Sequence, residues 1–256
     1  EHTASTYGLR VDKDAPVELH DFTLTNSLEG IGGEYNAVYV YTGGNLTIGS
    51  GTNIIVQDGG TYDANPNALY NDGTVTINGD AFLSIENKGR VITNYGTCTI
   101  GGNADDDIVL STSPSSGTGI LNFIGGILTI GTGATVSSNI GLANYNIATI
   151  SGGILASSST TVNNYASGTL YISRGTVRNI STNSTCNALV NNGTAFVSGG
   201  VITTDGTDCA IWTMYRLTLE GDCQVSAPNG TAVGSNTNTK ANSEIIIREN
   251  ASITGK

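Results

Sequence analysis

Short runs in which apolar and polar residues alternate recur along most of the chain. In the stretch VITNYGTCTI, residues 91–100, one parity holds Ile92, Asn94, Cys98 and Ile100, and the other holds Thr93, Tyr95, Thr97 and Thr99. Alternation with a period of two is typical of strands that bury one face, and the glycines between the runs favour turns. The pattern predicts short strands whose first set faces a core and whose second set faces outward.

The alternating runs belong to a repeated phrase. NALYNDGTVTING (67–79) and NALVNNGTAFVSG (187–199) share Asn-Ala-Leu, a second Asn and a Gly-Thr pair at the same offsets. Related copies lie between them. Together, the six copies place the second Asn at Asn71, Asn94, Asn122, Asn144, Asn164 and Asn191. The spacings give a period of about 24 residues. A unit of this length with two or three short strands and no helical segment is one coil of a β-solenoid.

Uneven spacing favours a right-handed parallel β-helix, whose turns absorb insertions. We therefore expect an all-β fold, a right-handed parallel β-helix (solenoid) of roughly nine or ten coils with an internal Asn ladder. One apolar column of this helix should contain Ile77, Ile100, Ile130, Ile150, Ile172, Val197 and Leu219. We expect a single domain over 1–256, with an N-terminal coil or cap (1–35), regular coils (36–230) and a C-terminal coil (231–256). This domain is expected to be a fragment of a longer chain or to have ends that are capped by loops.

The pattern A-φ-x-N-x-G-T-φ-x-I-x-G-G-x-φ extends over roughly residues 7–250. It resembles the right-handed parallel β-helix repeats of secreted and cell-surface proteins from Gram-positive, gut-type bacteria, which belong with the pectate-lyase-like fold. The resemblance implies this fold and a secreted or cell-surface location. It implies no single activity, because the fold hosts lyases, hydrolases, adhesins and phage tailspikes.

Composition narrows the classes of binding partner that the chain could have. Ten basic residues against 21 acidic ones give a net charge of −11, so the basic footprint of a nucleic-acid-binding protein is missing. An apolar run of 18 residues is also missing, which argues against membrane insertion. The four cysteines form no CxxC pair, so a zinc site is a poor interpretation. Cys186 and Cys209 lie one coil apart and could form a disulfide, although buried free thiols are the default.

Two columns follow the repeat at neighbouring positions. The ladder asparagines have inward parity, so we interpret them as structural rungs that hydrogen-bond one another. The next position has outward parity and carries four aromatic residues, Tyr95, Phe123, Tyr145 and Tyr165. Such a stripe could stack on sugar rings or on a partner's apolar surface. The alternative is that the rings stack on one another and shield the turn. Asp72 and Asn192 interrupt this column.

The one dense acidic run is Asp105, Asp106 and Asp107. With Asn103 it could hold Ca²⁺, or two of its carboxylates could serve a polysaccharide hydrolase; a solvated acidic loop is the alternative. Calcium is the one cofactor candidate, and no other cofactor is expected. The only histidines, His2 and His20, are far from this run in sequence, and the few basic residues are scattered.

These observations favour a non-enzymatic, adhesin-like module, secreted or at a cell surface, which binds carbohydrate or a host surface. Two alternatives stay open. One is a carbohydrate-active enzyme, either a polysaccharide lyase or a glycoside hydrolase, and the other is a phage tailspike.

Overall fold

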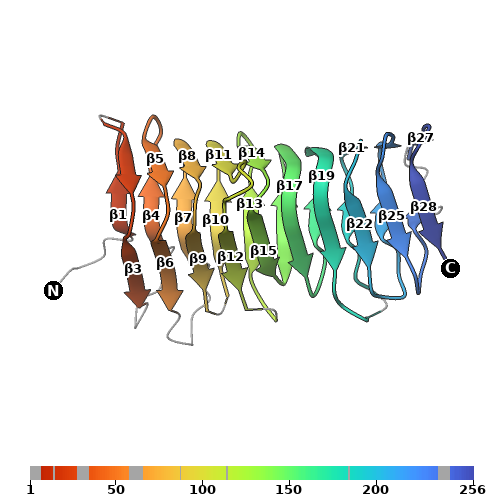
Figure 1. Cartoon of the computed structure of the whole chain (residues 1–256), viewed down its shortest axis with the longest axis horizontal. Coiled ribbons are helices and arrows are strands. Elements are labelled where there is room, and N and C mark those ends of the chain that lie inside the picture. The colour runs from red at the N-terminus through yellow and green to blue at the C-terminus, as the bar shows by residue number, and fades with distance from the viewer. Residues whose placement is uncertain are drawn as a thin grey trace.

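The chain folds into an all-β parallel solenoid of about nine turns with a repeat of about 25 residues. Figure 1 shows the turns following one another along a single axis, with the first and last strands at opposite ends. The described residues contain no helix. None of them could therefore supply a helix long and apolar enough to cross a membrane. The computed structural model describes residues 7–13, 15–27, 35–57, 66–86, 88–113, 115–183, 185–235 and 243–256.

Each turn contributes one strand to a 10-stranded sheet, sheet A. Its strands, in order, are β1 (Tyr7–Val11), β4 (Asn36–Val40), β7 (Asn67–Asn71), β10 (Arg90–Asn94), β13 (Thr118–Asn122), β16 (Ile140–Asn144), β18 (Val162–Asn164), β20 (Leu189–Asn191), β23 (Ile211–Thr213) and β26 (Val233–Ser235).

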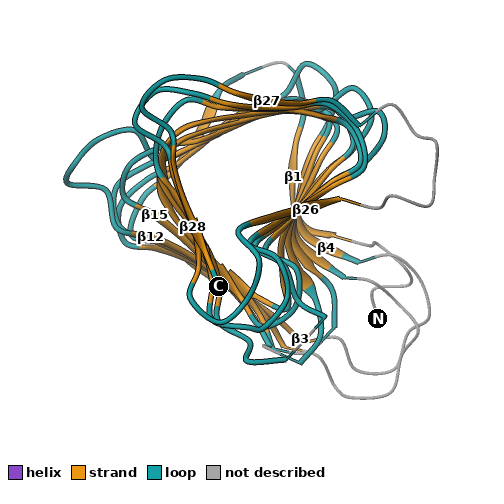
Figure 2. Cartoon of the chain, turned by 90° about the vertical axis from the view of Figure 1, so that its right-hand side faces the viewer, coloured by secondary structure: helices purple, strands orange, loops and turns teal. Residues whose placement is uncertain are grey.

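The remaining strands form an 18-stranded sheet, sheet B, in two parallel rows. Row B1 contains β2 (Val17–Leu19), β5 (Asn45–Ile48), β8 (Thr74–Ile77), β11 (Thr97–Ile100), β14 (Ile127–Ile130), the first parts of β17 (Ile147–Ser157) and β19 (Thr169–Asn179), β21 (Thr194–Val197), β24 (Leu217–Leu219) and β27 (Ile245–Ile247). Row B2 contains β3 (Thr23–Ser27), β6 (Thr52–Gln57), β9 (Ala81–Ile85), β12 (Ile108–Thr112), β15 (Ala134–Ser138), the second parts of β17 and β19, β22 (Val201–Thr204), β25 (Gln224–Ala227) and β28 (Ser252–Gly255). Viewed end-on in Figure 2, the strands of successive turns superimpose and the loops gather at the corners.

The core consists of columns, because the parallel register places equivalent residues of successive turns directly over one another. The predicted apolar column is confirmed: Ile77 pairs with Ile100, Ile100 with Ile130, and the series continues to Leu219. Every member of the column is at most 1% exposed. A turn of the solenoid therefore buries its apolar residues only by contact with the turns before and after it.

The Asn ladder is also confirmed. Each side-chain amide from Asn71 to Asn164 donates through Nδ2 to Oδ1 of the next ladder Asn at 2.8 Å. Asn191 ends the series by donating to Thr213 Oγ1 at 3.0 Å. Each rung also donates to a turn carbonyl, as Asn122 does to Ile147 O at 2.9 Å. The ladder thus binds neighbouring turns to one another and fixes the turn that follows sheet A.

Two details differ from the simplest expectation. Thr93 lies on the outward parity of sheet A but is only 1% exposed, and its hydroxyl donates to Asn67 Oδ1 at 2.5 Å. The outer side of sheet A is therefore covered at this turn. All four cysteines are buried free thiols, so Cys186 and Cys209 form no disulfide. Burial raises the pKa of the Cys98 thiol to about 12, as expected for a small apolar core residue.

Candidate binding surface at an aromatic corner

The residue after each ladder Asn lies at the corner between sheet A and row B1. The structure brings the four predicted aromatic residues together there. The backbone N–H of each donates to the ladder Asn of the preceding turn; Tyr95 N, for example, lies 2.8 Å from Asn71 O, and Tyr165 N lies 2.9 Å from Asn144 O. The ladder and its turns therefore place these rings at one strand spacing from one another.

The rings contact one another and form a longer series than the sequence indicated, called here the aromatic stack. Centroids of neighbouring rings are 3.9 to 5.4 Å apart. The members, in order, are Tyr41, Tyr39, Tyr70, Tyr95, Phe123, Tyr145 and Tyr165. All seven are half-buried. Because interior rings have a neighbour on each side, the stack offers solvent mainly ring edges and phenol hydroxyls.

Sequence reasoning missed Tyr39, Tyr41 and Tyr70. At the interruption by Asp72, rings from sheet A take over: Tyr70 lies 5.4 Å from Tyr95, and Tyr39 lies 4.8 Å from Tyr70. The Tyr39 hydroxyl donates to Asp72 Oδ2 at 2.6 Å. The sequence did contain a signal. Tyr70 directly precedes the ladder residue Asn71, and Tyr39 pairs with Tyr70 in the preceding turn, so both have outward parity.

The two ends of the aromatic stack differ. At the first end, the guanidinium of Arg10 lies over the Tyr41 ring, 4.2 Å from its centroid, and pairs with Asp12 at 2.9 Å. At the other end, Tyr165 lies face to face with Tyr145, with centroids 3.9 Å apart and planes 8° from parallel. The next turn places Asn192 at the equivalent position, with its backbone N donating to Asn164 O at 2.7 Å. A cation therefore covers one end of the stack and a short amide follows the other.

Two phenols of the stack, those of Tyr70 and Tyr165, have raised pKa values. Burial, followed by the hydrogen bond and the charge interaction with Tyr145, raises the pKa of Tyr165 to about 12. Burial and the nearby carboxylate of Asp72 raise the pKa of Tyr70 well above its usual range. Both hydroxyls remain protonated at neutral pH and can both donate and accept hydrogen bonds.

Exposed apolar side chains continue from the stack onto row B1. Ile124 is 63% exposed, Ile127 46% and Ile147 41%. One and two turns beyond Ile147, the rings of Tyr171 and Phe196 stack with centroids 5.3 Å apart. Residues 108–204, which contain all of these positions, include no Asp or Glu. The corner from Phe123 onward and the adjoining part of row B1 therefore form an apolar surface without carboxylates in a chain whose net charge is −11.

The acidic run lies at another corner, between rows B1 and B2. Asp106 is nearly buried, and both of its carboxylate oxygens accept backbone N–H groups, from Gly79 at 2.7 Å and from Asn103 at 2.9 Å. Asp105 and Asp107 are exposed. Across the described ranges, no three His, Cys, Asp or Glu side chains gather in a group suited to a metal ion. Asp106 thus stabilises the loop that contains it. A calcium site at Asp105, Asp106 and Asp107 stays a prediction.

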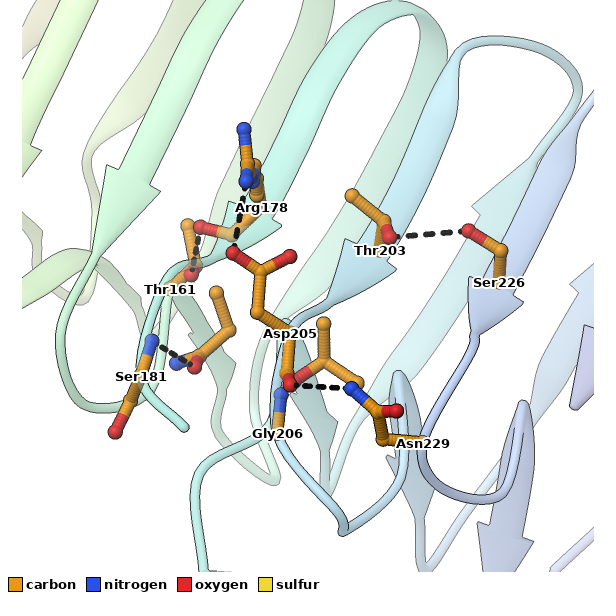
Figure 3. A network of polar contacts seen from close by, with 10 residues as sticks. Thr161, Arg178, Ser181, Thr203, Asp205, Gly206, Ser226 and Asn229 are labelled. Atoms are coloured by element: carbon orange, nitrogen blue, oxygen red, sulfur yellow. Dashed lines mark hydrogen bonds and ion pairs between the residues drawn. The ribbon is translucent and has the colours of Figure 1, made fainter. Parts of the chain in front are cut away.

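One basic residue of the middle turns, Arg178, forms an ion pair on row B2. Arg178 pairs with Asp205 of the following turn at 2.8 Å, with the two side chains 50% and 36% exposed. Figure 3 shows this pair beside Thr161, whose hydroxyl donates to the Arg178 carbonyl, and Asn229, whose amide donates to the Asp205 carbonyl. His20 lies at the N-terminal end with Glu18 3.7 Å away, whereas His2 is outside the described residues. The Arg178–Asp205 pair is therefore a surface contact between neighbouring turns, distant in sequence from the acidic run.

Comparison of the chain with protein-family models, with curated proteins and with solved structures gives no significant match.

Proposed function

We propose that this protein is a non-enzymatic, adhesin-like surface module that binds carbohydrate along the aromatic corner. The observation that carries the proposal is the half-exposed seven-ring stack, whose part from Phe123 to Tyr165 is continuous with exposed isoleucines in a stretch without carboxylates. An adhesin-like role is supported by the solenoid itself, because stacked turns form a rigid rod that holds one long face in place.

The chemistry of this corner suits a sugar chain. Saccharides present C–H groups that pack on aromatic and aliphatic surfaces, and hydroxyls that need hydrogen-bond partners. The corner supplies ring edges, neutral phenol hydroxyls such as that of Tyr165, and isoleucine side chains. Aromatic residues that present an apolar body with a polar tip are favoured at binding surfaces for this reason. A secreted or cell-surface location fits such a role and remains part of the proposal, as does the bacterial origin that the repeat pattern suggests.

The proposal can be tested by glycan-array binding combined with a turnover assay on the same sugars. We expect binding without product release. Tyr145→Ala should weaken binding about tenfold, because it removes one ring and separates its neighbours in the stack. Phe82→Ala is the matched control, since Phe82 is an outward aromatic residue on row B2, away from the corner. Equal binding by the two variants, or no binding by the wild-type protein, would refute the proposal.

A carbohydrate-active enzyme is the second candidate, and the Arg178–Asp205 pair favours it. The pair joins a cation and a carboxylate from neighbouring turns on row B2; a carboxylate can act as acid or base in polysaccharide cleavage, and the resemblance to pectate-type lyases implies arginine as a base. Under this candidate, polysaccharide cleavage would be measurable in the turnover assay and would disappear in Asp205→Asn. Under the binding proposal, Asp205→Asn leaves glycan binding unchanged.

A further inference from the structure

Row B1 carries an unbroken outward column of threonines beside the aromatic corner. In every turn from β5 to β17, one threonine pairs in register with the next: the members are Thr47, Thr76, Thr99, Thr129 and Thr149. Threonine is favoured on exposed strands in general, but this preference applies equally to row B2. The comparable outward column of row B2 is mixed and contains Ile55, Ser84, Ser111, Ser137 and Ala156. The threonine column is therefore a specific property of row B1.

A second outward column of row B1 lies between the threonine column and the corner. Over the same turns its members are Asn45, Thr74, Thr97, Ile127 and Ile147. None of these strand pairs is shifted in register, so both columns run straight along the solenoid axis; Figure 2 shows the row B1 strands, where β27 is labelled, superimposed in the end-on view. Successive turns are roughly 4.8 Å apart on this surface. We call the two columns together the threonine face.

The threonine hydroxyls of this face form no hydrogen bond within the described residues. Other threonine hydroxyls do, such as those of Thr52 and Thr161, which donate to backbone carbonyls at 2.9 and 2.8 Å. Thr74 and Thr97 are exposed, and the threonines of the outer column are half-buried. Because a β-branched side chain is stiff at χ1, the face presents hydroxyl and methyl groups at a fixed period. Each hydroxyl can donate or accept a hydrogen bond.

Each turn beside the corner repeats the same set of groups. An aromatic ring is followed by a branched side chain and then by a threonine, in the sets Tyr95, Thr97 and Thr99; Phe123, Ile127 and Thr129; and Tyr145, Ile147 and Thr149. The ring centroids of these turns are 4.9 and 5.4 Å apart, so the corner and the face have nearly the same period. Repeat proteins can bind one unit of a polymer per structural repeat, as some do with the bases of RNA. A ligand that contacts several of these turns in the same way must itself repeat at about one strand spacing.

The chemistry of the face favours an uncharged and extended chain. Between β5 and β17 its outward positions hold only Asn, Thr and Ile, so the face itself offers no cation to a uronate or a sulfate. Equatorial β-1,4 linkages keep a pyranose chain straight, and each sugar then advances by close to one strand spacing, roughly 4.8 Å. Chains with α-1,4 linkages coil, so they leave a straight face after a few residues. Successive β-1,4-linked sugars present hydroxyls from alternate edges, and a threonine hydroxyl can bond to either edge.

We propose that the threonine face binds an uncharged, extended β-1,4-linked polysaccharide that runs along the solenoid axis, with one sugar residue on each turn. The C–H groups of the chain pack on the threonine methyls and on Ile127 and Ile147, which are 46% and 41% exposed. Its hydroxyls bond to the threonine hydroxyls and, along the edge at the corner, to the phenols of Tyr95 and Tyr145. This inference rests on the proposed function and specifies the class of ligand and its direction.

The deciding experiment is calorimetric titration of the full chain with cello-, xylo-, manno- and maltohexaose. We expect the best of the three β-1,4-linked hexaoses to bind at least tenfold more tightly than maltohexaose, and more tightly than its own tetraose, because it contacts two more turns.

A double variant, Thr99→Val with Thr129→Val, tests the face directly. It removes two hydroxyls and keeps the β-branched shape, so it should keep the fold and weaken binding of the best hexaose about tenfold. Thr135→Val is the matched control, since Thr135 is a half-buried outward threonine on row B2, in the same turn as Thr129. The control should bind like wild type.

Several results would overturn this inference and leave the proposed function standing. They are binding of maltohexaose as tight as that of the best β-1,4-linked hexaose, equal affinity for hexaose and tetraose, an equal effect of the double variant and of Thr135→Val, and binding on the glycan array of charged or α-linked glycans alone. If the double variant does not fold, the comparisons of linkage and chain length on the wild-type protein decide the matter. If no hexaose binds and the glycan array is also blank, the inference and the proposed function are both refuted.

Discussion

The Asn ladder and the aromatic stack run side by side through the same turns, one residue apart, yet they tolerate change differently. Every ladder side chain from Asn71 to Asn191 is 0% exposed, and each is bonded both to the next rung and to a turn carbonyl. The stack is half-exposed, and the column of residues that follows the ladder, which supplies four of its rings, is interrupted twice, at Asp72 and Asn192. A buried amide without its partner is costly, so the ladder has to be continuous, whereas an outer ring can be exchanged at small cost.

The two interruptions of the stack have different consequences. At Asp72, Tyr39 and Tyr70 of sheet A supply the missing rings, and Tyr39 bonds the carboxylate at 2.6 Å. At Asn192, the sheet A positions of the same turn and of the preceding turn are Val190 and Asn163, which carry no ring, and the ring of this column lies in the following turn, at Trp212. The two interruptions therefore differ in which turn of the neighbouring column supplies a ring: the same and the preceding turn at Asp72, and the following turn at Asn192.

Breaking the ladder should produce the largest effect. Asn122→Leu removes an amide that donates to Asn144 Oδ1, Gly126 O and Ile147 O and accepts from Asn94. Because several buried groups lose their partners together, we expect the free energy of unfolding to fall by about 3 kcal/mol, measured by urea denaturation. Ligand affinity of the folded protein should stay unchanged.

Asn53→Leu is the matched control for this substitution. The Asn53 amide has one hydrogen bond, to Gly51 O at 3.3 Å, on the exposed side of row B2. Its loss should cost less than about 1 kcal/mol. If the two substitutions destabilise the protein equally, the ladder has no special role in stability.

Filling the two interruptions should shift stability in opposite directions. Asp72→Tyr puts a ring where Tyr70 already lies and takes the acceptor from the Tyr39 hydroxyl, so we expect a loss of about 1–2 kcal/mol. Asn192→Tyr adds a ring contact to Tyr165 and should gain about 0.5–1.5 kcal/mol. Urea denaturation of both variants measures the difference, with Asp72→Asn as the control that keeps an acceptor. A shift of the same sign in both variants would contradict the comparison.

Sequence periodicity was sufficient to predict the solenoid, the ladder and the apolar column from Ile77 to Leu219, because each depends on residues that recur at equivalent positions of successive turns. It also identified four rings of the stack for the same reason. Tyr39 and Tyr70 were missed because they belong to another column and enter the stack only through the side-chain directions at Asp72. The role of Asp106 was missed as well, because its backbone partner on Gly79 comes from an earlier turn. Contacts between columns depend on the shape of a corner, which the repeat does not specify.

The smallest effect concerns the alkaline stability of the Tyr165 end of the aromatic stack. The pKa of Tyr165 is about 12, above its ordinary value of 10.0, chiefly because of burial. A raised pKa of the folded state means that the folded protein holds this proton more tightly than the unfolded chain. The associated stabilisation is complete below pH 10 and is lost as the pH rises from 10 toward 12. Thermal unfolding midpoints should therefore fall over this window more steeply for wild type than for Tyr165→Phe, which keeps the ring but cannot ionise. Tyr171→Phe, on row B1 outside the stack, provides the control. Equal slopes for wild type and Tyr165→Phe would show that the Tyr165 hydroxyl is no less hydrated than an ordinary surface phenol.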